Sequence, residues 1–360
     1  MTRSRELAEL ASAYDSGSSL GFRNRIINGD MRIDQRNAGA SQTPTTDDTF
    51  NVDRWAAGIN VASKFSMQQN TADAPTTQGF SHCVKITSLS AYSVAAGDVA
   101  VYKQTIEGNN IADLAWGTAS AKAVTLSFWV RSSLTGTFGG TLMNSAQNRA
   151  YPFTYTISAA NTWEQKTVNI AGDTTGTWLT TNGAGIKLGF QLGVGSTFTG
   201  TAGSWSANNY WGATGATNLI ATNGATFYIT GVQLEAGTVA TPFERRDYGR
   251  ELIMCQRYFC KTFEAATAPA QNAGSNGAIG FVSQANTLWD AMWRYPVEMR
   301  ATPTHIGFST NAASSNWSTN SDTPASSFVS AGSTGVTCRA TQPTAAGRAF
   351  TIHITASAEL

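Results

Sequence analysis

The stretch FYITGVQLEAGTVATPFERRDYGRELIMCQRYFCKTF, residues 227–263, changes character along its length. Its first part alternates with the period of two that is typical of a strand, and its last part has the charge and spacing of a helix. Gly237 and Pro242 lie between the two parts and interrupt the strand pattern. The stretch therefore predicts the last strand of a β domain, followed by a helix that rises from Asp247.

The composition limits the possible functions. Of 360 residues, 41% are hydrophobic and 10% aromatic, which is enough to build folded cores. Only 13% are charged, against a usual value of about 25%, and the formal net charge is +1. No apolar run approaches the roughly 20 residues that cross a bilayer, and the N-terminus has no hydrophobic signal core. We expect no nucleic-acid partner, no membrane insertion and synthesis in a cytoplasm.

Strand patterns fill residues 22–245. In VTLSFWVRSS, residues 124–133, Leu126, Phe128 and Val130 fall on one face of the predicted strand. Trp129 and Arg131 fall on the other face. Residues 153–172 and 186–195 alternate in the same way and are bounded by turn-forming residues. The pattern predicts a mainly β protein with an antiparallel sandwich or jelly roll.

Two further regions flank this domain. Leu7, Leu10 and Tyr14 have helical spacing, which predicts a short amphipathic helix within residues 1–21 that needs a partner surface. Residues 263–360 are expected to form a small β domain that ends in FTIHITASA, residues 350–358. In that last strand the apolar residues are expected to face inward and His353 outward.

Several motifs, in order, resemble those of tailed-phage fibre proteins. They are NRIINGDMRIDQR at residues 24–36, DRW at 53–55, LSFWVR at 126–131 and the closing QLEAG…ATPFE…YG.EL..CQRY. In such proteins these motifs belong to a jelly roll like that of carbohydrate-binding modules. The resemblance implies four parts: an attachment helix (1–21), a jelly roll (22–245), a connecting helix (246–262) and a C-terminal β tip (263–360).

Mixed charge gathers where the connecting helix is expected. Residues 171–226 carry only Asp173 and Lys187, whereas residues 244–257 carry a cluster of both signs. We expect ion pairs that fix orientation, either within the chain or between identical chains, and we select Arg246 and Arg250 as candidate contacts. An ordinary solvated helix face is the alternative.

No metal or other cofactor is expected. Sugar-binding jelly rolls hold a structural calcium ion with acidic residues in the opening and closing strands, but here Arg32 and Thr230–Gly231 stand at the corresponding positions. Calcium prefers several oxygen ligands, usually including carboxylates. The four cysteines have no zinc-binding spacing and are expected to be small apolar residues.

Binding fits the sequence better than catalysis. The histidines lie far apart and no hydrolase or nucleotide-binding motif is present, so we expect no enzyme. Glycoside hydrolysis needs only two carboxylates, so a capsule depolymerase remains an alternative. Trp205, Tyr210 and Trp211 lie in an uncharged loop and could stack on sugars, pack under the loop or contact another subunit. Trp317 is the residue that we expect to be exposed for receptor contact, with a packed loop anchor as the alternative.

The resemblance to phage fibre proteins, which are generally homotrimers, implies one hypothesis. The chain is expected to be a virion component, a homotrimeric phage tail fibre that attaches to tail or baseplate proteins through its N-terminal helix and binds a host glycan or protein receptor. The alternatives are a head or baseplate decoration protein without receptor binding, or the depolymerase.

Overall fold

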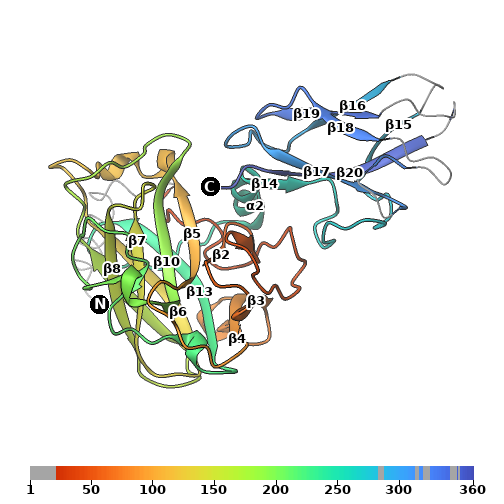
Figure 1. The fold of residues 1–360 in the computed structure, drawn as a ribbon. Coiled ribbons are helices and arrows are strands. Elements are labelled where there is room, and N and C mark those ends of the chain that lie inside the picture. The colour runs from red at the N-terminus through yellow and green to blue at the C-terminus, as the bar shows by residue number, and fades with distance from the viewer. Residues whose placement is uncertain (1–21, 283–287, 313–315, 319–324, 341–346, 348) are drawn as a thin grey trace, which may run out of the picture.

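The computed structural model describes residues 22–282, 288–312, 316–318, 325–340, 347 and 349–360. Two sheets form a sandwich, and a smaller C-terminal β unit lies to one side, with helix α2 (Tyr248–Gln256) between them (Figure 1). The predicted mainly β fold with an antiparallel sandwich is confirmed. The expected helix within residues 1–21 lies outside the described residues. Within the described part, no helix is long and apolar enough to span a bilayer.

One sheet of the sandwich has six strands in the order β1-β2-β5-β10-β7-β8, all paired antiparallel. The strands are β1 (Thr49–Phe50), β2 (Ala56–Ile59), β5 (Val99–Glu107), β10 (Ala184–Val194), β7 (Gly136–Met143) and β8 (Ala150–Ile157). A loop with the short parallel pair β11 (Thr199–Gly200) and β12 (Gly212–Ala213) covers part of its outer face.

The facing sheet has five strands in the order β3-β4-β13-β6-β9, again all antiparallel. They are β3 (Phe65–Asn70), β4 (Cys83–Ser88), β13 (Thr226–Ala236), β6 (Val124–Ser132) and β9 (Glu164–Ile170). The short 3-10 helices are η1 (Thr76–Gln78), η2 (Gly108–Asn110), η3 (Ala112–Leu114), η4 (Ser196–Phe198) and η5 (Leu219–Ala221). The predicted faces of β6 are correct, since Leu126, Phe128 and Val130 are buried in the core between the sheets.

The C-terminal unit has its own core and two sheets. In one, β20 (Ala349–Ser357) is central and pairs with β14 (Phe259–Lys261), β15 (Ile279–Val282) and β17 (Thr304–Ser309). In the other, β19 (Gly335–Ala340) lies between β16 (Trp289–Arg294) and β18 (Ser326–Val329). Phe350, Ile352 and Ile354 point into this core as predicted.

The expectation for His353 is wrong, because its side chain is buried and not outward. Its ring stacks on Phe263 with 3.9 Å between centroids, and Thr262 lies within hydrogen-bond distance of its Nδ1. The segment that follows β14 therefore covers the second face of β20, which alternation within β20 alone does not reveal.

Candidate functional site

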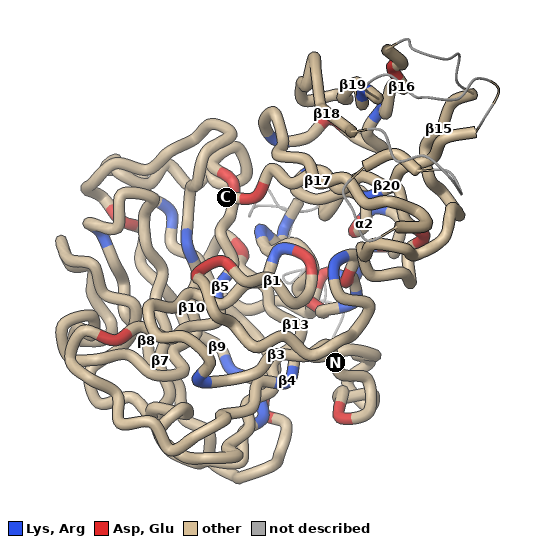
Figure 2. The backbone as a smooth tube through the Cα atoms, turned by 45° about the vertical axis from the view of Figure 1, so that its right-hand side comes forward, with Lys and Arg blue, Asp and Glu red and all other residues tan. Residues whose placement is uncertain are grey.

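The most elaborate polar structure of the chain is the connection between the sandwich and the C-terminal unit. We call it the joint and define it by residues 23–36, 244–259 and 358–360, together with the groups that they contact. Figure 2 shows charged residues gathered in this region, whereas much of both β units carries few. The joint is where the sequence concentrates mixed charge, so its contacts decide how the two units are held.

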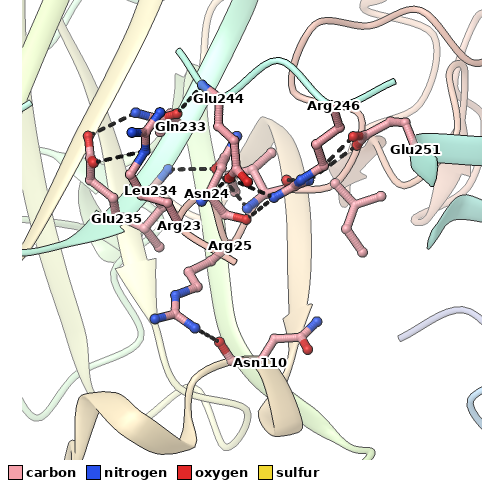
Figure 3. A network of polar contacts seen from close by, with 12 residues as sticks. Arg23, Asn24, Arg25, Asn110, Gln233, Leu234, Glu235, Glu244, Arg246 and Glu251 are labelled. Carbon is pink, nitrogen blue, oxygen red and sulfur yellow. Dashed lines mark hydrogen bonds and ion pairs between the residues drawn. The ribbon is translucent and has the colours of Figure 1, made fainter. Parts of the chain in front are cut away.

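Arg246 is the centre of the first network in the joint, which Figure 3 shows from close by. Its guanidinium donates to the backbone oxygens of Asn24 and Ile26, the latter at 3.1 Å. It also forms ion pairs with Glu244 at 3.3 Å and Glu251 at 3.4 Å. The side chain is buried. Arg246 therefore connects residues 24–26 to both sides of the turn that enters α2.

Glu251 completes this network from the first turn of α2. Its buried carboxylate accepts the backbone N–H of Asn28 and faces Arg246. Burial raises the pKa of Glu251 above its ordinary value, although the charge of Arg246 and the bond from Asn28 act against the rise. Asp247 caps the same helix by accepting the Arg250 N–H at 2.9 Å. These contacts determine where α2 begins and how it is oriented.

The closing strand is tied to the same region through Asn24. Its side chain donates to the Val232 oxygen at 3.1 Å and accepts the Leu234 N–H at 3.0 Å. From β13, Gln233 accepts the N–H of Glu244 at 2.8 Å, and Glu235 accepts the Thr241 hydroxyl at 2.6 Å. β13 ends at Ala236, and the loop that follows is thus bonded back onto the strand.

A second network joins the end of α2 to the sandwich. Arg257 donates Nε and Nη2 to the two carboxylate oxygens of Glu107 at 2.9 and 2.7 Å, and Tyr258 donates its hydroxyl to Glu107 at 2.6 Å. Burial raises the pKa of Glu107, but the hydrogen bonds from Arg257, Tyr258 and Asn109 lower it by more, so it lies below the ordinary value of 4.5. Glu107 is therefore held as a carboxylate at neutral pH.

A third network ties the C-terminal residues to the sandwich. Glu359 pairs with Arg36 at 2.9 Å and also with Arg54. The two guanidinium groups stack on Phe259 and Tyr258, at 3.8 and 3.6 Å from the ring centroids. Aromatic faces and a carboxylate thus enclose both cations between the two units.

Two sets of hydrogen bonds extend the joint on either side. Gln35 donates to the Phe259 oxygen at 2.8 Å, and its other partner is the buried carboxylate of Asp53. Arg300 donates to the Asn182 oxygen at 2.9 Å, and Asn182 donates back to Arg300 at 3.0 Å. The buried polar networks around Arg246 and Glu107 have defined geometry, so the joint fixes one orientation of the units.

The two predicted arginines of the joint are placed differently. Arg246 is buried within one chain, so the structure assigns it an intrachain role. Arg250 lies on the exposed side of α2. Leu7, Leu10 and Tyr14 lie outside the described residues.

The three aromatic residues of the uncharged loop pack largely against the sandwich. Trp205 is half-buried among Trp116, Trp178 and Tyr151, and its Nε1 donates to the Ala171 oxygen at 2.7 Å. Trp211 is buried and Tyr210 half-buried over the outer face of the six-stranded sheet. Most of the surface of these three side chains is therefore packed under the loop, which is the second of the three alternatives.

Trp317 is not exposed, so that expectation is wrong. Its side chain has no solvent-accessible surface and packs in the C-terminal core against Phe281, with ring centroids 4.8 Å apart. The flanking Ser318 bridges to Thr351 of β20. The polar residues around Trp317 suggested an exposed position, whereas its side chain is packed in the C-terminal core, as the alternative of a packed loop anchor predicts.

Ionisable groups do not gather into a metal-binding cluster in the part of the chain that the structure describes. In those residues no group of three His, Cys, Asp or Glu could hold a metal ion. Asp34 accepts three backbone N–H groups of the turn at residues 36–39, so its carboxylate stabilises that turn. Asp30 pairs with Arg32. All four cysteines are free and buried, as expected for small apolar residues.

The sequence analysis missed the joint residues Glu107, Glu359, Arg36, Arg54 and Asp53. The sequence contained an indication of them. Because only 13% of the residues are charged, an isolated charged residue within a strand pattern indicates a partner elsewhere in the chain. The partners are far away in sequence: Glu107 pairs with Arg257, and Arg54 with Glu359.

Comparisons with known proteins give similarity to solved structures only. No family model matches the chain. No curated protein matches it in sequence. Similar structures include a putative sugar-binding protein from Bacteroides thetaiotaomicron, with 13% identity over 60% of this chain and 100% of that one and a TM-score of 0.35.

Two further structures are similar over part of the chain. The enzymatically active domain of tailspike protein 4 from bacteriophage CBA120 has 13% identity over 59% of this chain and a TM-score of 0.33, and the chain spans 21% of the tailspike chain. A family 11 carbohydrate-binding module from Clostridium thermocellum, solved with a mixed-linked tetrasaccharide, has 11% identity over 56% of this chain and 98% of that one, with a TM-score of 0.28. Similarities of this size carry no conclusion about activity.

Proposed function

We propose that this chain is the subunit of a homotrimeric phage tail fibre that binds a host-surface glycan during adsorption and catalyses no reaction. Residues 1–21 attach the fibre to other virion proteins, and the subunits assemble in the host cytoplasm before they enter the virion. The sandwich and the C-terminal unit form the part of the fibre that meets the host.

The observation that carries the proposal is the joint. Domains joined by a short segment move relative to one another unless their interface is large or strongly bonded. Here Glu107 of the second network and Glu359 of the third network each receive two or more donors from across the connection. Such contacts add little to net stability when buried, but they specify one geometry. A fixed orientation of two β units is useful to a fibre, which must present its binding surface at a defined angle.

The composition and motifs support the glycan part of the proposal. With 13% charged residues and a net charge of +1, the surface recognises partners mainly through neutral polar groups and aromatic faces. Sugar rings offer hydroxyl groups and an apolar face, which match that chemistry. The closing motif at residues 233–258 also resembles that of phage fibres.

Adhesion to whole cells tests this function. Fluorescently labelled full-length protein is incubated with a panel of bacterial strains, each strain also being treated with periodate, which oxidises vicinal diols of surface glycans. We expect binding to at least one strain and its loss after periodate treatment. Adhesion that survives periodate would contradict the glycan assignment. If the protein adheres to none of the strains but binds a virion protein tightly through residues 1–21, a decoration protein is favoured. If it releases new reducing ends from the host polysaccharide, a depolymerase is favoured.

A further inference from the structure

A small pocket opens on the outer face of the five-stranded sheet, beside the start of the joint at Arg245. Its volume is about 200 Å³. Trp129 of β6 and Gln165 of β9 are directly paired across the strands, and Thr230 of β13 pairs with Trp129 on its other side. Drug-sized ligands occupy roughly 300–1,000 Å³, so this pocket fits a single ring.

The floor of the pocket is a β-bulge that requires glycine. The pairing of β13 with β6 shifts register between Thr230 and Gln233, and Gly231 within the bulge has a φ of 60°. A Cβ at Gly231 would lie 2.6 Å from the Phe80 ring and 3.1 Å from Trp129. Bulges occur often beside binding sites, where they redirect a strand. Gly231 thus keeps the space in front of Trp129 open.

One wall of the pocket is the guanidinium group of Arg245, which is fixed in place by hydrogen bonds. Arg245 donates to the oxygens of Gly79 and Gln78 at 2.7 and 3.0 Å, and its guanidinium lies 4.6 Å from the centroid of the Phe80 ring. Its partners are backbone oxygens and an aromatic ring, and no acidic residue lines the pocket in the part of the chain that the structure describes. The charge of Arg245 is therefore positioned without a compensating carboxylate in the pocket.

Three of the other polar side chains that line the pocket have no internal partner among the described residues. Among the described residues, the side chains of Ser127 and Gln165 and the Trp129 indole N–H form no hydrogen bond with the protein. Gln165 is exposed and Trp129 half-buried, so both are accessible to a ligand. The pocket thus combines a partly exposed indole, an amide, a hydroxyl and a guanidinium around one ring-sized space. An aromatic face packs on the apolar face of a sugar ring, and amide and hydroxyl groups bond its hydroxyls.

We propose that this pocket binds one pyranose ring of a host polysaccharide, and that it favours a ring that carries a carboxylate. Trp129 stacks on the ring, Gln165 and Ser127 bond its hydroxyls, and Arg245 attracts the carboxylate. The proposal rests on the proposed glycan-binding function and assigns its site to the sheet face, not to the loop of Trp205 or to Trp317.

The direct test uses simple sugars and the full-length protein. Methyl glucoside, galactoside, mannoside and glucuronide are titrated while saturation-transfer NMR and the chemical shifts of isotope-labelled protein are recorded. A one-ring site predicts a Kd of roughly 1 mM for the best ligand, and the glucuronide is expected to bind more tightly than the glucoside. No binding of any of the four, or preference for the glucoside, would overturn the proposal.

Paired variants assign the site. Gln165→Ala and Trp129→Ala are expected to weaken binding about tenfold or more, which corresponds to about 1.4 kcal/mol. Gln68→Ala on β3 and Trp163→Ala beside β9 are matched controls on the same sheet, and they should leave the affinity for the sugar unchanged. Gln165 is exposed, so its variant tests the site even if Trp129→Ala fails to fold.

The cell assay separates this proposal from the proposed function. Periodate-sensitive adhesion that Gln165→Ala and Trp129→Ala leave unchanged would overturn the pocket and retain glycan binding elsewhere on the chain. Adhesion that is insensitive to periodate would overturn the function itself.

Discussion

Arg257 and Glu107 form a two-bond ion pair, with Nε–Oε2 and Nη2–Oε1 distances of 2.9 and 2.7 Å, that joins the end of α2 to the end of β5. Paired bonds of this kind fix both the distance and the plane of the two groups. The Tyr258 hydroxyl reaches the same carboxylate at 2.6 Å. Consecutive residues after α2 are thus attached to one buried acid of the sandwich.

Removing the charge of Glu107 should weaken the joint. Glu107→Gln keeps the size of the side chain but replaces charge-assisted bonds, so we expect a loss of about 2 kcal/mol in the free energy of unfolding. The measurement is chemical denaturation of the full chain. Asp290→Asn is the matched control, because its pair with Arg339 is exposed and should contribute about 0–1 kcal/mol. Equal effects of the two substitutions would argue against a structural role for the Glu107 network.

The stabilising effect of Glu107 should depend on pH. Its pKa is below 4.5 in the folded protein, so the native state binds this proton less readily than the unfolded state. The contribution is therefore fully present above the ordinary pKa and is lost as pH falls through the folded pKa. Gln at this position cannot titrate. The difference in stability between the parent protein and Glu107→Gln should be constant above about pH 6 and shrink below about pH 4, whereas a difference that grows on acidification would contradict the assignment.

Arg246 and Arg250 should respond differently to truncation. Arg246→Ala leaves Glu251 buried without its cation, which costs about 3–5 kcal/mol. Arg250 is exposed, so a contact of its side chain is solvated and Arg250→Ala should cost less than Arg246→Ala, about 0–1 kcal/mol. Thermal denaturation of both variants is the check. A larger effect of Arg250→Ala, accompanied by a lower assembly mass, would show that the exposed arginine contacts another subunit.

Trp317 should matter for folding. Trp317→Ala removes a fully buried indole from the C-terminal core, at a cost of about 3–5 kcal/mol. Met292→Ala on β16 is the control, since Met292 is 61% exposed. Denaturation of the two variants measures the difference. An unchanged stability of Trp317→Ala together with lost adhesion would restore Trp317 as a receptor contact.

Local periodicity predicted the fold well where one strand has one buried face. The alternation of residues 124–133 placed Phe128 and Trp129 on opposite faces, and in the structure Phe128 lies in the core while Trp129 is half-buried on the other face. Periodicity failed for His353, and the polar composition around Trp317 was misleading for that residue. Both are covered by segments remote in sequence, and such covering depends on tertiary packing that a single strand pattern does not encode.

The contacts of the joint could likewise be predicted only in part from the sequence. The cluster of mixed charge at residues 244–257 correctly indicated where ion pairs gather, but left open whether they bridge parts of one chain or separate chains. The answer depends on Asn24, Asn28 and Glu107, which meet the cluster only after the sandwich has closed. The sheet-face pocket was not predicted either, because the bulge at Gly231 becomes visible only in the pairing of β13 with β6.

The solution mass of the full-length protein tests the fibre assignment most directly. Multi-angle light scattering after size-exclusion chromatography gives the mass independently of molecular shape. The proposed fibre predicts three times the chain mass of 38.1 kDa, unchanged on dilution. A monomer at every concentration tested would contradict the homotrimeric fibre.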